Sequence, residues 1–262
     1  MNLLKAYNLI KENLELINSI NIFPVYDKDT GSNVLYTLES IKDIEITKDN
    51  LSDIANKAIF SARGNSGNIL SLFLIGLAEN KDKSLYDMCK DASDFVWNNM
   101  YNPKHGTMLD ALNSVPKTFE DLETFILYYY NNILSELFYG KQKLNVLYEN
   151  DTVDAGTLCL TYIFKGLYES LSNKVIEFNI KLNPIDKEID KNKYKYCINF
   201  NIENISCPMP KDIEYDEYIK TSFNNSCRIH LHTNDYNSIL QFYSKFGEIN
   251  NVYIQDMEKE EG

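Results

Sequence analysis

Residues 21–33 read NIFPVYDKDTGSN and gather oxygen ligands and small residues into one turn. Two carboxylates, Asp27 and Asp29, stand two residues apart behind Pro24, and Thr, Gly, Ser and Asn follow at once. Magnesium prefers oxygen ligands and commonly binds together with phosphates, and a glycine lets the backbone approach a phosphate closely. The stretch is therefore a candidate metal–nucleotide site. The same residue types are also ordinary in a surface turn that caps a helix.

The composition limits the possible partners. The chain has 262 residues, 44% of them hydrophobic, and a formal net charge of −12. Its length is enough for one large domain or two modest ones. An acidic chain without a basic block is a poor nucleic-acid binder, because neutralised phosphates supply most of that affinity. We therefore expect no nucleic-acid partner, and we expect ATP to bind only with the help of a cation.

The cysteines and the N-terminus indicate the compartment. The five cysteines are scattered and odd in number, so they predict no disulfide framework. The first residues mix apolar side chains with Lys, Glu and Asn and lack the apolar core of a signal peptide. No apolar run reaches the length of about 18 residues that a membrane helix needs. These patterns predict a cytoplasmic, reduced protein without a membrane span.

The first two-thirds of the chain has a helical pattern. Apolar residues recur at helical spacing, as Leu3, Ala6 and Ile10 show, and similar stripes follow as far as residue 171. About eight helices joined by short loops are expected, which favours an antiparallel helical bundle or barrel.

After residue 172 the pattern changes to a period of two, which is typical of strands. The predicted strands are 175–182, 194–202, 228–233 and 251–256, with a helix over 237–246. The predicted fold class is therefore α plus α/β. Residues 1–172 form a helical domain and residues 173–262 a small α/β domain.

Three more polar loops, residues 61–67, 104–110 and 151–157, each place small residues ahead of a predicted helix. Backbone N–H groups at a helix N-terminus bind anions. Each loop alone is equally explained as an interhelical turn or a helix cap. If the four loops meet at one end of the helical domain, they form a phosphate- and metal-binding rim.

The four segments occur in the order seen in the dihydroxyacetone kinase L-type (DhaL) ATP-binding domain, which the chain resembles over essentially its whole length. The motifs that carry the resemblance are DKDTGSN (27–33), ARGNSG (62–67), GTML (106–109) and VDAG (153–156). The most similar version is the ATP-binding subunit of bacterial fatty acid kinase. Residues 196–197 and 228–233 of this chain also resemble the middle domain of that subunit. The resemblance implies an eight-helix antiparallel barrel that binds Mg-ATP at one end.

The resemblance also implies roles for individual residues. Asp27 and Asp29 would hold the magnesium ions that bridge the phosphates, and they are the expected catalytic pair. Phosphoryl transfer needs positioning and charge neutralisation more than covalent chemistry from the protein. The implied nucleotide contacts are Thr30, Gly31, Ser32, Asn33, Arg63, Gly64, Asn65, Ser66, Gly67, Gly106, Thr107, Met108, Asp154 and Gly156.

Three features depart from the family pattern. Lys28 stands where the family usually has Gly between the two carboxylates, and Asn21 is the nearest polar residue where dihydroxyacetone kinases have an earlier Asp. The large C-terminal domain of the fatty acid kinase subunit is absent from this sequence. The resemblance implies a separate fatty-acid-binding carrier protein as partner, and the absence of that domain counts against docking of the partner and full kinase turnover.

A second candidate metal site lies in the small domain. His230 and His232 are two apart on a predicted strand, so both side chains point to one face. With Cys197 from a neighbouring strand they offer three nitrogen and sulfur ligands, a set that suits zinc. The alternative is a buried cysteine beside two hydrogen-bonded strand histidines. On the zinc interpretation this domain is a dimerisation unit, so that a homodimer is expected.

The predicted function is an ATP-dependent kinase subunit. Its acceptor would be a fatty acid on a separate carrier protein or a small hydroxy compound such as dihydroxyacetone. The alternative is a non-catalytic nucleotide- and metal-binding relative, because Lys28 interrupts the carboxylate pair and the C-terminal domain is absent.

Overall fold

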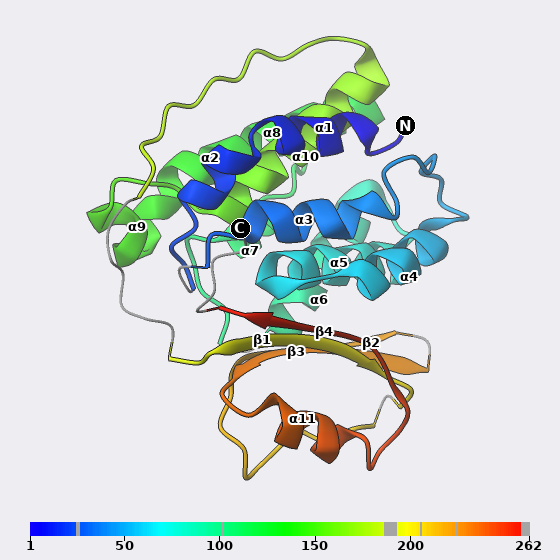
Figure 1. The fold of residues 1–262 in the computed structure, drawn as a ribbon. Coiled ribbons are helices and arrows are strands. Elements are labelled where there is room, and N and C mark those ends of the chain that lie inside the picture. The colour runs from blue at the N-terminus through cyan, green and yellow to red at the C-terminus, as the bar shows by residue number, and fades with distance from the viewer. Residues whose placement is uncertain (25–26, 101, 186–192, 205, 224, 258–262) are drawn as a thin grey trace.

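The computed structural model describes residues 1–24, 27–100, 102–185, 193–204, 206–223 and 225–257. Val25 and Tyr26 of the opening turn lie outside the described residues. The molecule has a helical part and, against one side of it, a small sheet that carries a single helix on its far face (Figure 1). None of the helices in the described residues is long and apolar enough to cross a membrane.

The helical part covers the first two-thirds of the chain, as the apolar periodicity predicts. Its elements are α1 (Leu4–Glu12), α2 (Leu14–Ser19), α3 (Thr30–Glu39), α4 (Leu51–Ser61), α5 (Gly64–Glu79), α6 (Leu85–Asn99), α7 (Met108–Asn113), α8 (Leu122–Tyr139), η1 (Gly140–Lys143), α9 (Asn145–Glu149) and α10 (Ala155–Ser172).

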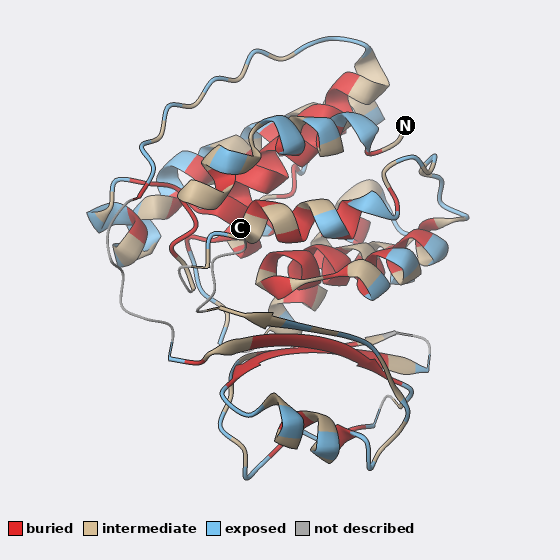
Figure 2. Ribbon diagram, viewed as in Figure 1, coloured by how far each residue is buried: buried red, intermediate tan, exposed pale blue. Residues whose placement is uncertain are grey.

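Helix α10 lies at the centre of the helical part. Every residue from Ala155 to Gly166 is buried, and the helix packs against α1, α3 and α8 (Figure 2). A Cβ atom on Gly166 would lie 2.4 Å from the backbone nitrogen of Ala6, so α1 and α10 approach backbone to backbone. A helix that is apolar on all sides is stable only when other helices surround it, and this one organises the core.

The small sheet is antiparallel throughout. Its strands are β1 (Tyr196–Ile202), β2 (Asp216–Phe223), β3 (Ser226–Thr233) and β4 (Ile249–Asp256), in the order β2-β3-β1-β4. Helix α11 (Tyr236–Tyr243) covers one face, where Phe200, Ile229 and Leu231 pack beneath Ile239 and Tyr243 (Figure 1).

The other face of the sheet points toward the helical part and is polar. We call it the polar face, and β1 and β3 supply its buried residues Cys197, Asn199, Asn201, Arg228, His230 and His232. Strand β2 adds Ile219 and Thr221 to the same face. Because successive side chains of a strand point to opposite faces, β1 and β3 each supply alternate apolar residues to α11 and polar residues to the helices. A buried polar layer thus lies between two apolar cores, and Figure 2 shows that β1 and β3 are buried along much of their length.

The strand predicted for residues 175–182 is wrong. The segment belongs to no strand, although Ile176, Phe178, Ile180 and Leu182 pack against the core of the helical part. The main-chain N–H of Ile176 donates to Glu169 Oε1 at 3.0 Å, which ties the segment to α10. Apolar and polar residues do alternate along the segment, but its apolar side chains pack against helices and not within a sheet. Conversely, β2 was not predicted.

Candidate functional site

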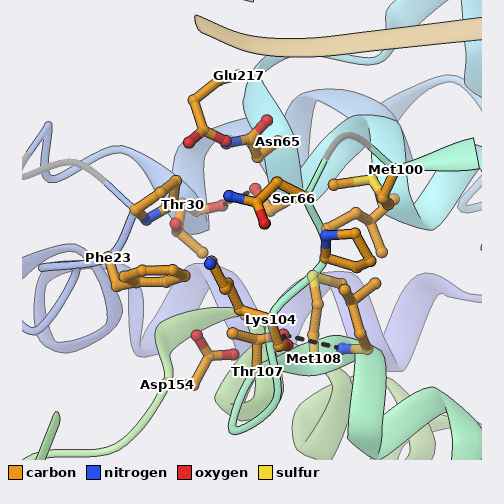
Figure 3. Close-up of a pocket in the computed structure, with 16 residues that line it drawn as sticks. Phe23, Thr30, Asn65, Ser66, Met100, Lys104, Thr107, Met108, Asp154 and Glu217 are labelled. Atoms are coloured by element: carbon orange, nitrogen blue, oxygen red, sulfur yellow. Dashed lines mark hydrogen bonds between the residues drawn. The ribbon is translucent and has the colours of Figure 1, made fainter. Parts of the chain in front are cut away.

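A single pocket collects residues from all four polar loops, and the sheet closes one side of it (Figure 3). The loops start α3, α5, α7 and α10, so four helix N-termini surround the same space. The residues that line it are Phe23, Pro24, Thr30, Asn65, Ser66, Ile69, Met100, Asn102, Pro103, Lys104, Thr107, Met108, Leu109, Asp154, Gly156 and Glu217.

The opening turn holds its two carboxyl groups together beside this pocket. Asp27 and Asp29 are hydrogen-bonded to each other, and burial followed by the charge of Asp29 raises the pKa of Asp27 well above its ordinary value. Asn21, which is 2% exposed, donates from its amide to Asp27 and accepts from the hydroxyl of Thr30. Asn21 therefore connects the carboxyl pair to a residue of the pocket wall.

The side chain of Asp29 does not cap helix α3, although helix capping was the alternative explanation for this turn. Asp29 occupies the N-cap position of α3, but only its main-chain oxygen takes part there, accepting from Asn33 N at 2.8 Å. Asn18 serves the first turn instead: its Oδ1 accepts from Gly31 N at 2.8 Å and its Nδ2 donates to Ser32 Oγ at 3.0 Å. Gly31, Ser32 and Asn33 thus seat α3 on its neighbours and do not line the pocket.

Lys28 has a backbone conformation that favours glycine. Its φ is +54°, in the left-handed region, and its side chain is exposed. A non-glycine residue pays about 1–2 kcal/mol there because its Cβ crowds the following carbonyl. The geometry explains why the resembled family has Gly between the two carboxylates.

The second loop divides into packing residues and pocket residues. Gly64, with φ of +55°, lies so close to α3 that a Cβ would sit 2.2 Å from Asn33 Nδ2. A Cβ on Gly67 would lie 2.5 Å from Thr37 Oγ1. These two glycines therefore allow α3 and α5 to touch. They do not line the pocket.

Arg63, expected to add charge at the phosphates, lies outside the pocket wall. Its guanidinium stands 3.4 Å from the centroid of the Tyr36 ring and 3.9 Å from that of Tyr253, one ring from α3 and one from β4. Such cation–π contacts stabilise packing, so Arg63 joins the helical part to the sheet. From the same loop, Asn65 and Ser66 do line the pocket, and Ser66 Oγ donates to Thr30 O at 3.3 Å.

The third loop begins α7 at the pocket. Thr107 is the N-cap, its Oγ1 accepting from Leu109 N at 3.4 Å. Gly106, with φ of +83°, does not line the pocket and donates from its N–H to Asp110 Oδ2 at 2.9 Å. Thr107 and Met108 line the pocket as the family resemblance implies.

The fourth loop places a buried carboxyl group between two helix starts. Asp154 caps α10 by accepting from Thr157 N at 2.7 Å and from Thr157 Oγ1 at 2.8 Å. The pKa of Asp154 is raised to about 6, because the effect of burial exceeds the lowering by the hydrogen bonds from Thr157 and from the N–H of Met108. Asp154 and Gly156 both line the pocket.

Residues 24–169 match the DAK2 domain family. The chain belongs to this family. Protein YloV of Bacillus subtilis is 24% identical over 97% of this chain and 54% of its own length. Uncharacterized protein MG369 of Mycoplasma genitalium is 23% identical over 95% of this chain and 54% of its own length. The chain thus spans about half the length of these curated relatives, and its DAK2 domain contains all four pocket loops.

The sequence analysis missed Glu217, a pocket residue that follows the DAK2 match in the chain. Glu217, on β2, extends to the pocket and accepts from Asn65 Nδ2 at 2.9 Å. Its φ is +52°, beside an irregularity in the β2–β3 register. Residues 216–223 carry no strong strand pattern, so nothing local in the sequence signals this residue.

Cys197, His230 and His232 come together on the polar face, as their strand positions predict. One ligand atom from each lies within 4.8 Å of the others, and Cys197 Sγ is 3.8 Å from His230 Nδ1. All three side chains are buried, and burial lowers the pKa of His230 well below its usual value and that of His232 to about 4. The histidines are therefore neutral at pH 7, the form that binds metals.

This cluster faces the DAK2 domain. Burial raises the pKa of the Cys197 thiol, and the charges of Asp29 and Asp27 raise it further, which places the carboxyl pair near the sulfur. Asn199 Nδ2 lies 3.6 Å from Cys197 Sγ, and Asn199 Oδ1 accepts from Asn68 Nδ2 of α5 at 3.2 Å. The two candidate metal sites are thus neighbours across the same polar layer.

Proposed function

We propose that this chain binds Mg-ATP in the four-loop pocket and serves as a kinase subunit. The proposed acceptor of the γ-phosphate is a fatty acid held by a separate carrier protein, or a small hydroxy compound such as dihydroxyacetone. The observation that carries the proposal is the contact between the carboxyl groups of Asp27 and Asp29 beside a pocket that all four loops line. Membership of the DAK2 domain family supports the kinase-related part.

The carboxyl pair fits a divalent cation. Two carboxylates in contact repel each other when both are ionised, and burial disfavours the charged form of Asp27 further. A bound cation removes both penalties, and carboxylate oxygens are the ligands that magnesium accepts. Asp27 and Asp29 would hold the ion, with Asn21 fixing the orientation of Asp27. Magnesium bound there neutralises phosphate charge during phosphoryl transfer.

The other pocket residues supply binding and orientation. The side chains of Thr30, Ser66 and Thr107 offer hydroxyl groups around the pocket, and Lys104 adds a positive charge to its wall. Met100 and Met108 give an apolar wall of the kind that accepts a flat base. Aligning the reactants accounts for much of the rate in such reactions.

The broader arrangement follows from the same proposal. The helices of the DAK2 domain correspond to the eight-helix barrel of DhaL domains. The chain acts with a fatty-acid-binding carrier protein and forms a homodimer through the sheet. The exposed side chains of Val252 and Ile254 on the edge strand β4 offer an apolar surface for that dimer.

A non-catalytic nucleotide- and metal-binding relative is the second candidate. The observation that favours it is Lys28, which holds a glycine-type backbone conformation between the two carboxylates. This candidate binds Mg-ADP but transfers no phosphate.

Calorimetry with Mg-ADP tests both candidates. We expect binding by the wild type and a loss of at least about 10-fold in affinity for Asp29→Ala, because a ligand of the cation is removed. The matched control is Asp82→Ala, an exposed carboxylate outside the pocket. Absence of binding by the wild type rules out the nucleotide site. Binding without phosphate transfer to a loaded carrier or to dihydroxyacetone selects the second candidate.

We also propose that Cys197, His230 and His232 bind zinc. A tetrahedral zinc with bonds of about 2.3 Å to sulfur and about 2.0 Å to nitrogen holds those atoms about 3.5 Å apart, close to the 3.8 Å between Cys197 Sγ and His230 Nδ1. Elemental analysis should find near-stoichiometric zinc, lost in His230→Ala combined with His232→Ala. The third histidine gives the control, His105→Ala. Zinc that persists in the double variant contradicts the assignment.

A further inference from the structure

The wall of the pocket includes a carboxylate, Glu217, that comes from the sheet and is held by an amide of the helical part. Asn65 belongs to the first turn of α5, and Glu217 reaches it from β2 (Figure 3). Because Asn65 Nδ2 donates to Glu217, the amide orientation is settled: its oxygen, Oδ1, points elsewhere. Asn65 Oδ1 is buried and accepts no hydrogen bond within the described part of the chain.

The backbone of Glu217 is held in a strained conformation. Its φ is +52°, and its N–H donates to Asp216 Oδ1 at 2.9 Å. Two residues later, Ile219 forms an isolated bridge with Met100, another residue of the pocket wall. Strained residues persist where the surrounding structure fixes them, and they cluster at functional sites. Here the surroundings hold the Glu217 side chain at the pocket.

The surroundings of the Glu217 carboxylate indicate what it can contact. Met100, Met108 and Ile69 form an apolar part of the same pocket, while the hydroxyl-bearing residues Thr30 and Ser66 lie toward the carboxyl pair. A carboxylate repels phosphate oxygens but accepts hydrogen bonds from O–H and N–H groups. Asn65 supplies one donor to Glu217, and a ligand that brings a further donor to this carboxylate gains affinity.

We propose that the Glu217 carboxylate, held in place by Asn65 Nδ2, forms a subsite that accepts hydrogen bonds from donor groups of the bound nucleotide, its ribose hydroxyls or the amine of its base. The inference rests on the proposed function, because it assumes that a nucleotide occupies the pocket. It makes the nucleotide site a joint product of the DAK2 domain and the sheet. Removing the sheet contribution therefore changes which nucleotides bind, in addition to how tightly they bind.

Calorimetry with three magnesium-loaded ligands tests the subsite: ADP, 2′-deoxyadenosine diphosphate and inosine diphosphate. The wild type should bind ADP about 10-fold more tightly than whichever analogue lacks the contacted donor. That ratio should fall to about 1 in Glu217→Ala and shrink in Glu217→Gln. A ratio against the deoxy ligand identifies the ribose hydroxyl, and a ratio against the inosine ligand identifies the base amine.

The control is Glu214→Gln, an exposed carboxylate three positions earlier, which should keep the wild-type ratios. Circular dichroism checks that each variant is folded. Equal affinities of the wild type for all three ligands, or ratios that survive Glu217→Ala, overturn the subsite. Tighter binding of every ligand by both Glu217 variants also overturns it, because the carboxylate would then only repel phosphates. Failure of the wild type to bind ADP at all refutes the proposed function itself.

Discussion

The two faces of the small sheet are built on opposite principles. Beneath α11, β1 and β3 present a closed apolar layer that includes Phe200, Ile229 and Leu231, each 0% exposed. Toward the DAK2 domain, the same two strands present the polar face, where Arg228 Nε and His230 Nε2 are buried without a hydrogen-bond partner in the described structure. Such atoms cost about 1–3 kcal/mol each. The apolar face therefore provides stability, whereas the unpartnered polar atoms of the polar face lower it.

The largest effect is expected on the apolar face. Phe200→Ala should lower the free energy of unfolding by about 3–5 kcal/mol, because it leaves a cavity beneath α11. Phe200 is 0% exposed, and its ring centroid lies 5.1 Å from that of Tyr243. Urea denaturation measures the change. A loss below about 1 kcal/mol would mean that the apolar face is not the stabilising side.

Asp154→Asn should have the next largest effect, and it should depend on pH. The folded protein holds the Asp154 proton more tightly than the unfolded chain does, since its pKa rises from 3.8 to about 6. The resulting stabilisation is complete below pH 3.8 and is lost as the pH rises through about 6. Asparagine caps a helix equally well and carries no such loss.

The difference in the free energy of unfolding between Asp154→Asn and the wild type should therefore depend on pH. It should shift in favour of the variant by up to about 3 kcal/mol between pH 4 and pH 7.5. Chemical denaturation at the two pH values measures the difference. Asp82→Asn, an exposed position, gives the control. Parallel pH profiles for wild type and Asp154→Asn would show that burial of this carboxyl group is not costly, and would remove Asp154 from the set of polar groups that lower stability.

A smaller gain is expected from Lys28→Gly. Glycine adopts the φ of +54° without steric cost, so the variant should be more stable by about 1 kcal/mol. Thermal unfolding is the measurement. Lys48→Gly, an exposed lysine without a positive φ, should instead lose stability. Titration with magnesium on the same variant tests whether Lys28 competes for the carboxyl pair: an unchanged affinity contradicts competition.

The smallest effect on stability is expected on the polar face. His230→Leu in metal-free protein should change the free energy of unfolding by less than about 1 kcal/mol, because it removes an unpaired buried nitrogen and keeps a similar volume. The same variant should lose bound zinc. A large destabilisation of the metal-free protein would show that both faces of the sheet serve stability, and the contrast between them would fail.

The sequence by itself determined the features that depend on near neighbours. The helical spacing of apolar residues predicted that the first two-thirds of the chain is helical. Four polar loops at helix starts, in the order of the resembled family, predicted the pocket that Thr30, Ser66, Thr107 and Asp154 line. The alternation along β3 placed His230 and His232 on one face. These features are local, because the spacing of residues along a helix or strand fixes which side chains share a face.

Only the tertiary structure decided which surfaces meet. The alternating residues 175–182 pack against the core of the helical part and, within the described residues, pair with no strand. Glu217 reaches the pocket from a strand with an irregular register. The packing contacts of Gly64 with α3 and of Arg63 with two tyrosine rings also join parts of the chain that lie far apart in sequence. The spacing of apolar residues, the charge and the residue types of a segment indicate what that segment can bury or bind. The partner that it meets is set by contacts between residues distant in sequence, and no local pattern encodes them.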